Sequence, residues 1–167
     1  PSGKPRSLAR RKAIYALCVK YGVMILEDNP YGELRFRGED IPTFKSMDDE
    51  GIVIYNGSYS KVLSAGMRIG FVMAQKDVLQ RLTVAKQFSD CHSNIFFQIV
   101  TDEWLRTADV DAHIAKIRKI YRERCDFMLK LLDEHMDKRV TYTRPDGGLF
   151  LWCTLPEGCD SQELADL

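Results

Sequence analysis

The chain has 167 residues, 45% of them apolar and 29% charged, which is typical of a globular protein with one domain or parts of two. Lysine and arginine together number 24, as do aspartate and glutamate, so no net charge favours nucleic acid or an anionic membrane as a partner. No apolar run reaches the length of a membrane span, and the five cysteines lack CxxC spacing. We therefore expect a cytoplasmic protein with reduced thiols and no metal site.

The first predicted element is a helix that begins after Ser7 and ends at Gly22. The Ser7 side chain can cap the first turn, and glycine can adopt the left-handed conformation that closes many helices. Apolar residues recur at helical spacing at Ile14, Leu17, Cys18 and Tyr21.

Three short apolar runs, 23–27, 52–56 and 69–73, are predicted to be fully buried strands. A helix followed by such strands predicts an α/β layer with a parallel sheet. In parallel sheets, ligands bind beyond the carboxyl ends of the strands. Asp28 and Ser58 lie just past two such ends, so we expect their loops to face one crevice.

Three helices are predicted after the strands, over 76–87, 94–105 and about 110–136. The third would be roughly 40 Å long, enough to leave one domain and enter another. The residues expected to share its apolar face are Ile114, Ile117, Tyr121, Met128, Leu131 and His135. After it, RVTYT and LFLWCTLP flank the turn RPDGG, which predicts an antiparallel strand pair in a smaller unit.

The stretch GSYSKVLSAGMRIGF, residues 57–71, places Lys61 in a loop between two predicted strands, where loops carry chemistry on a rigid scaffold. Ser58, Ser60 and Arg68 could grip a phosphate, because arginine binds phosphate through paired hydrogen bonds. A partly desolvated lysine amine forms Schiff bases with carbonyl compounds. The alternative is a surface lysine and a structural arginine.

Residues 27–36, EDNPYGELRF, place Asp28 and Tyr31 in a turn built around Pro30 and Gly32. A carboxylate here could pair with a protonated ring nitrogen, and the phenol could donate to a ring oxygen. The alternative is that Asp28 forms an ordinary turn and Tyr31 packs on the surface. Taken alone, this segment favours that alternative.

Four segments together resemble the class I and II aminotransferases, enzymes of fold type I that use pyridoxal 5′-phosphate (PLP). They are PSGKP, EDNPYGELRF, GSYSKVLSAGMRIGF and RPDGGLFLWCTLP, in family order along essentially the whole chain. The chain looks most like the aromatic amino acid, 2-aminoadipate and kynurenine aminotransferases. The resemblance implies an α/β fold, with the later part of a mostly parallel PLP-binding large domain (1–106), a connecting helix (107–138) and the start of a small α+β domain (139–167).

The resemblance also implies a role for each motif residue. Lys61 would hold PLP as an internal aldimine, Asp28 would bind the pyridine nitrogen, and Tyr31 would hydrogen-bond the ring oxygen. Three residues would hold the phosphate: Ser58, Ser60 and Arg68. The implied activity is transamination between an amino acid and a 2-oxo acid, with aromatic, branched and 2-aminoadipate-like amino acids all open.

The chain departs from the family pattern in two ways. Ala65 stands where the family usually has proline before the glycine, which would loosen the loop slightly. The asparagine that contacts the ring, the aromatic residue that stacks on it and the arginine that binds the substrate carboxylate would all fall outside this sequence. We therefore expect a fragment that is inactive by itself and comes from a homodimeric parent.

Three alternatives stay open. The first is the PLP-sensing, aminotransferase-like domain of a helix-turn-helix transcription regulator. The sequence NPYGELRF favours the enzyme over this alternative. The second is a carbon–sulfur lyase of the same fold, which would use the same lysine. The third is a remnant without catalysis, with a sheet edge left exposed.

Overall fold

The computed structural model describes residues 6–166, so the PSGKP motif lies outside the described residues. The helices are α1 (Leu8–Tyr21), α2 (Lys76–Ser89), α3 (Ile95–Thr107), α4 (Val110–His135) and α5 (Ser161–Ala165). The strands are β1 (Ile25–Asp28), β2 (Val53–Ser58), β3 (Gly70–Met73), β4 (Thr141–Tyr142) and β5 (Cys153–Thr154). Short 3₁₀ turns occur at Gly32–Leu34 (η1), Lys45–Met47 (η2) and Ala65–Met67 (η3). Each predicted helix and strand is present, with ends that shift by one or a few residues.

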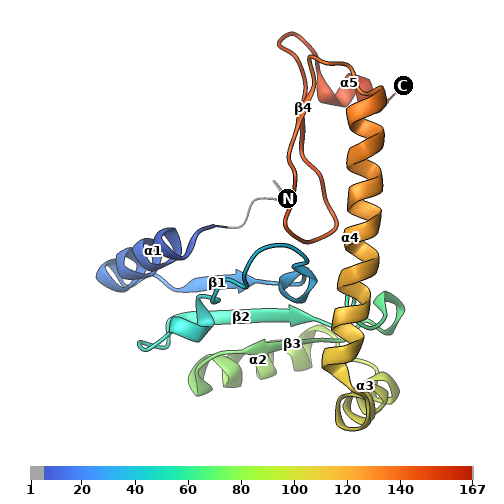
Figure 1. Cartoon of the computed structure of the whole chain (residues 1–167). Coiled ribbons are helices and arrows are strands. Elements are labelled where there is room, and N and C mark those ends of the chain that lie inside the picture. The colour runs from blue at the N-terminus through green and yellow to red at the C-terminus, as the bar shows by residue number, and fades with distance from the viewer. Residues whose placement is uncertain (1–5, 167) are drawn as a thin grey trace.

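Figure 1 shows how these elements are arranged. The strands β1 and β2 point toward the lower half of α4, which stands upright at one end of the sheet. The hairpin that carries β4 runs beside the upper half of α4. The long helix therefore contacts two parts of the chain. Its lower half contacts the sheet unit (β1, β2, β3 and their loops), and its upper half contacts the hairpin unit (β4, β5 and the turn between them). No helix in residues 6–166 is both long and apolar enough to cross a membrane.

The sheet has the order β1-β2-β3 and mixes two strand directions. β1 and β2 are parallel, as the sequence predicted, and Ile25 lies opposite Val53. β2 and β3 are antiparallel, with Ser58 opposite Gly70, so the prediction of a parallel third strand was wrong. The loop between β2 and β3 is too short for the helical crossover that a parallel neighbour requires.

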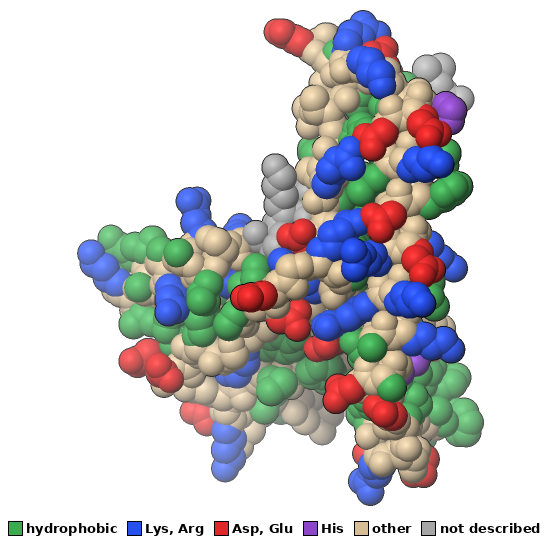
Figure 2. Space-filling view, in the orientation of Figure 1, with side chains coloured by type: hydrophobic (Ala, Val, Ile, Leu, Met, Phe, Trp, Pro, Cys, Tyr) green, Lys and Arg blue, Asp and Glu red, His purple; other side chains and the backbone are tan. Residues whose placement is uncertain are grey.

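The prediction that all three strands are fully buried was also wrong. Every residue of β3 is exposed, whereas Val53 at the start of β2 is fully buried. Apolar runs indicate a buried strand only where layers cover both faces of the sheet, and no element in residues 6–166 covers β3 in this way. Figure 2 shows hydrophobic side chains on the surface around α1 and α3. The small core consists of Leu34, Phe44, Val53, Ile69, Ile114 and Leu129.

The predicted ends of α1 are confirmed. Ser7 Oγ accepts a hydrogen bond from the Arg10 amide at 3.3 Å, which satisfies one of the N–H groups that a helix leaves free at its start. Gly22 closes the helix in the left-handed conformation, with φ of 62°.

The predicted apolar face of α4 is correct for its first half and wrong for its second. Ile114 is buried, but Met128 and His135 are exposed, and Leu129 is buried in place of Met128. A helix with 3.6 residues per turn drifts against a seven-residue spacing, so the contact stripe moves by one position over two or three turns. The buried stripe therefore runs along one side of α4, from Ile114 through the half-buried Tyr121 and Cys125 to Leu129.

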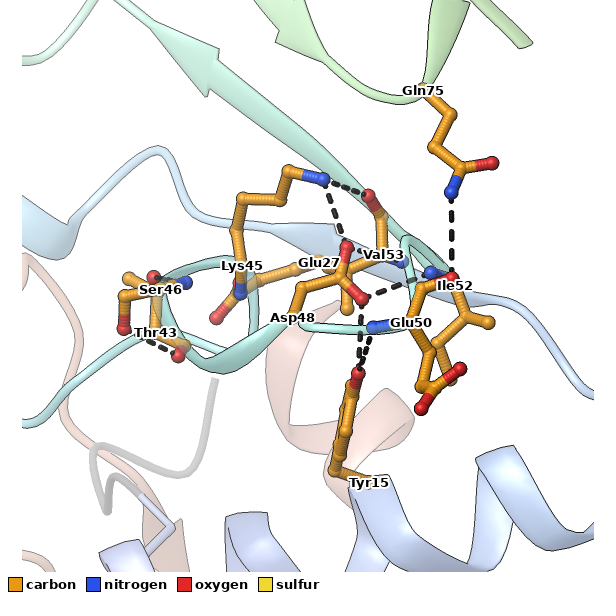
Figure 3. A network of polar contacts seen from close by, with 10 residues as sticks. All are labelled: Tyr15, Glu27, Thr43, Lys45, Ser46, Asp48, Glu50, Ile52, Val53 and Gln75. Carbon is orange, nitrogen blue, oxygen red and sulfur yellow. Dashed lines mark hydrogen bonds and ion pairs between the residues drawn. The ribbon is translucent and has the colours of Figure 1, made fainter. Parts of the chain in front are cut away.

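A buried carboxylate holds the amino end of β2 (Figure 3). The Asp48 side chain has no exposed surface and accepts hydrogen bonds from Ile52 N at 2.9 Å and Val53 N at 3.1 Å. Lys45 Nζ donates to it at 2.9 Å and the Tyr15 hydroxyl at 3.2 Å. Burial would raise the pKa of Asp48, but the hydrogen bonds from Lys45, Val53 and Ile52 outweigh it and lower the pKa below its ordinary value.

Glu27 links the middle of β1 to the same region. Its two carboxylate oxygens accept hydrogen bonds from Phe44 N and Lys45 N, both at 2.9 Å. Arg11 of α1 lies 3.8 Å from the same carboxylate. These contacts fix β1 against η2 and α1, and hence fix the position of Asp28, the next residue along the strand.

The hairpin unit is antiparallel, as predicted, but its strands are only two residues long. Its turn binds the segment that follows η1, because the amides of Phe36 and Arg37 both donate to Asp146 O at 2.9 Å. Gly147 pairs with Arg35 in an isolated bridge. A Cβ on Gly147 would lie 2.6 Å from Arg35 Cα, so only glycine allows this approach.

Candidate active site

Two of the predicted site residues end neighbouring strands. Asp28 is the last residue of β1 and Ser58 the last residue of β2, whereas the sequence placed both just past the ends of these strands. Because β1 and β2 are parallel, both residues lie at the same edge of the sheet, as expected. Asn56 joins the two strands there: its Nδ2 donates to Asp28 Oδ1 at 2.9 Å, and its carbonyl accepts from Asn29 N.

Lys61 lies in a closed turn that follows β2. Leu63 N donates to Tyr59 O at 2.8 Å and Tyr59 N donates to Ile69 O at 3.1 Å, so the loop folds back on its own start. Lys61 Nζ lies 6.0 Å from the centre of the Tyr31 ring, within the range of a cation–π contact. No carboxylate in residues 6–166 forms an ion pair with this amine. The structure thus brings two predicted residues from separate loops together.

The three predicted phosphate ligands are only partly gathered. Ser58 Oγ accepts a hydrogen bond from Ser60 N at 3.1 Å, so these two residues lie together. The exposed Arg68 instead donates from its guanidinium to Ala65 O at 3.3 Å, and no polar contact within the described chain joins it to either serine. Arg68 has a φ of 57°, a strained conformation for a residue with a Cβ that is concentrated at ligand-binding sites.

Three residues near the site were missed by the sequence analysis. They are Asn56, Phe71 and Phe150. Phe150 packs edge-on against Tyr31, with ring centres 5.6 Å apart. The ring centres of Phe71 and Tyr59 are 5.5 Å apart. Burial raises the pKa of the Tyr59 hydroxyl above its ordinary value. A sequence signal for Asn56 existed, because it is a polar residue at the end of a predicted strand that runs parallel to the strand ending near Asp28. The two phenylalanines gave no signal beyond ordinary apolar patterning.

Comparison with known proteins identifies the family. Residues 1–166 match the model of the family described as aminotransferase class I and II. The chain belongs to this family. Its fold is that of the fold type I aminotransferases, of which the described residues form less than half.

Two aminotransferases are similar to this chain. An aromatic-amino-acid aminotransferase of Thermococcus litoralis is 43% identical over 162 residues, which cover 97% of this chain and 39% of the relative. The crystal structure of the Pyrococcus horikoshii kynurenine aminotransferase, in complex with PMP, KYN as substrates and KYA as products, is 39% identical with a TM-score of 0.95. It aligns with 99% of this chain, which covers 41% of that structure. The chain therefore spans about two fifths of the length of these relatives.

A protein of another class is also similar. The HTH-type transcriptional regulator YisV of Bacillus subtilis is 34% identical over 154 residues, which cover 92% of this chain and 32% of the regulator. The proteins similar to this chain thus include both aminotransferases and a transcriptional regulator.

The residues at the edge of the sheet fit PLP, the cofactor that the family implies. Asp28 uses one oxygen for Asn56, and its Oδ2 has no hydrogen-bond partner in the described structure. Ser58, Ser60 and Arg68 offer hydroxyl and guanidinium donors of the kind that bind a phosphate. The Lys61 amine, which has no ion-pair partner among residues 6–166, completes the set. The donors, the acceptor and the amine match the phosphate, the ring nitrogen and the aldehyde of PLP respectively.

Proposed function

We propose that the chain is part of a PLP-dependent aminotransferase that moves an amino group from an amino acid to a 2-oxo acid. One observation supports the proposal most directly. Lys61 Nζ lies 6.0 Å from the centre of the Tyr31 ring, beside the carboxyl ends of β1 and β2. An amine, a phenol and a carboxylate at one sheet edge are the groups that this chemistry needs. Aromatic, branched and 2-aminoadipate-like amino acids are the substrates we propose.

Each residue of the site has a task in this proposal. When bound, PLP supplies a conjugated ring that stabilises negative charge at the amino acid α-carbon. Asp28 would hold the ring nitrogen in its protonated form, and Tyr31 would donate to the ring oxygen. Lys61 would attach the cofactor and, once displaced by substrate, take the proton from the α-carbon as a general base. The phosphate would be held by Ser58, Ser60 and Arg68.

The parent protein is proposed to be a cytoplasmic homodimer, on two grounds. The small core and the exposed apolar residues of β3 and α3 leave surface that further chain or a second copy would cover. The even balance of charge does not favour a membrane or nucleic acid partner. Gel filtration of the full-length protein tests the dimer, and a monomer would contradict it.

Cofactor attachment is tested by mixing the full-length protein with PLP, reducing with borohydride and locating the label by peptide mass. We expect the label on Lys61 and its loss in Lys61→Ala. Lys76→Ala is the matched control, because Lys76 is an exposed lysine at the start of α2. Label spread over surface lysines in the wild-type protein would overturn the proposal.

A second candidate is a PLP-sensing domain of a transcription regulator, which the similarity to YisV favours. Both candidates bind PLP on Lys61, so labelling does not separate them. An enzyme converts an added amino acid to its 2-oxo acid, whereas a sensor binds PLP without turnover. A carbon–sulfur lyase would instead release ammonia and a thiol from a sulfur-containing amino acid. Product analysis with the full-length protein distinguishes the three.

A further inference from the structure

The first turns of α4 contact both loops of the site through side chains. His113 Nε2 lies 2.7 Å from Val62 O, the carbonyl directly after Lys61. Arg118 Nε donates to Glu33 O at 2.6 Å, two residues after Tyr31. One stretch of helix thus holds the backbone next to each member of the Lys61–Tyr31 pair.

The contact of His113 with Val62 has a defined direction. A carbonyl oxygen only accepts, so Nε2 of His113 carries the proton and donates it. The Val62 carbonyl is not used inside the turn, where Leu63 N and Ser64 N both bind Tyr59 O. The loop that carries Lys61 therefore has a free acceptor, and α4 satisfies it.

The His113 ring is itself held in place. Trp104 of α3 packs edge-on against it, with ring centres 5.4 Å apart and an angle of 83° between the planes. The imidazole is half-buried between the two helices and the loop. Because an indole holds the His113 ring on one side and a carbonyl holds it on the other, the Lys61 loop has little freedom to move relative to α4.

Arg118 provides the second half of this support. Its guanidinium lies 3.6 Å from Glu33 and 3.8 Å from Asp40 in addition to its bond to the Glu33 carbonyl. The two contacts with Glu33 fix η1, the turn that directly follows Tyr31, and the third holds Asp40 in the segment after it. Because His113 and Arg118 are five residues apart on one rigid helix, the distance between the two loops is set by α4.

We propose that His113 and Arg118 are positioning residues that set the Lys61 amine against the Tyr31 ring, and so govern how Lys61 meets the cofactor. The support that α4 gives the two loops follows from these contacts alone. Its consequence for Lys61 rests on the proposed function. Neither residue touches the reacting atoms.

Hydrogen exchange of the full-length protein tests the support itself. In His113→Leu, the Leu63 and Ser64 amides should exchange about tenfold faster, which is the loss expected for one hydrogen bond. The Ile25 amide, bound to Ile52 O at the far end of β1, should keep its rate. His113→Gln retains an N–H donor and should restore the slow rate, and His135→Leu at the exposed end of α4 is the matched control. Unchanged exchange at 63–64, or an equal rise at Ile25, would overturn the proposal.

Labelling of Lys61 by PLP and borohydride tests the consequence. The rate of labelling should fall about tenfold in His113→Leu and in Arg118→Met, and His113→Gln should recover it. Arg122→Met is the control for arginine, because within residues 6–166 the Arg122 side chain pairs only with Asp126 of the same helix. If the wild-type protein is labelled at Lys61, and His113→Leu and Arg118→Met are labelled as fast as the wild type, the positioning role is wrong while the proposed function stands. If the wild-type protein does not label there, the proposed function falls, and the exchange measurement still decides the support.

Discussion

The two ends of the β1–β2 pair use their charged residues in opposite ways. At the amino end of β2, the buried Asp48 carboxylate accepts from Lys45, from Tyr15 and from two backbone amides. At the carboxyl end of β1, Asp28 is exposed and accepts from Asn56 alone among the described residues. The lysines differ likewise: Lys45 Nζ binds Asp48 and Val53 O, whereas in the part of the chain that the structure describes Lys61 Nζ contacts only the Tyr31 ring.

This difference separates residues that hold the fold from residues that can bind a ligand. A buried carboxylate whose lone pairs are all used fixes the strand beside it and has nothing left for a ligand. A carboxylate with a free oxygen at the end of a strand keeps its capacity for a ring nitrogen. The same residue types therefore serve stability at one end of the strands and chemistry at the other.

The largest effect is expected for Asp28→Asn in the full-length protein. Asparagine keeps the shape but not the charge that would hold the ring nitrogen protonated. We expect the transamination rate to fall on the order of 10²–10³-fold, as for other losses of one preorganised electrostatic contact. The free energy of unfolding should change by less than about 0.5 kcal/mol. Chemical denaturation beside the rate assay checks this, and a large loss of stability would contradict the division between the two ends.

Asp48→Asn should show the reverse pattern. The amide NH₂ would face the Lys45 ammonium and backbone N–H donors, so we expect a loss of about 3–5 kcal/mol in the free energy of unfolding. Denaturant titration measures it, with the exposed neighbour Asp49→Asn as control. A change of less than about 1 kcal/mol would show that the network contributes little.

Gly147→Ala should cost less, about 1–3 kcal/mol of the free energy of unfolding, by overpacking. The added Cβ would lie 2.6 Å from Arg35 Cα and 2.7 Å from Leu34 O, so the hairpin turn must move away from η1. Gly66→Ala is the matched control, because its nearest neighbour, Ser64 Oγ, is 3.9 Å away. Equal stability of the two variants in thermal unfolding would contradict this account.

The smallest effect concerns acid. The pKa of Asp48 is lower in the folded chain than in the unfolded chain, so its contribution to stability is present above the ordinary carboxyl pKa of about 3.9. That contribution is lost as the pH falls from this value through the lower folded value, because in this range the unfolded state binds a proton that the folded state does not yet hold. The wild-type protein should therefore lose stability more steeply than Asp48→Asn below about pH 4 in a series of denaturant titrations. Parallel curves would show that Asp48 does not titrate with unfolding.

The local signals in the sequence predicted the order of the helices and strands well. Ser7 and Gly22 mark the ends of α1, because capping depends on the residue itself and on its immediate neighbours. Lys61 and Asp28 stood out because their motifs place reactive groups beside glycine and proline turns at strand ends. The direction of β3 and the buried side of the second half of α4 were predicted wrongly, because both depend on which neighbours the chain meets in space.

The sequence by itself therefore determined the order of helices and strands, the family and the set of residues at the sheet edge. These properties follow from periodicity, capping and motif wording, which act over a few residues at a time. Only the tertiary structure decided that Asn56 binds Asp28, that Lys61 meets the face of Tyr31, and that α4 holds both loops through His113 and Arg118. Each of these contacts joins residues far apart along the chain, so it exists only once parallel strand pairing and helix packing have brought those segments together.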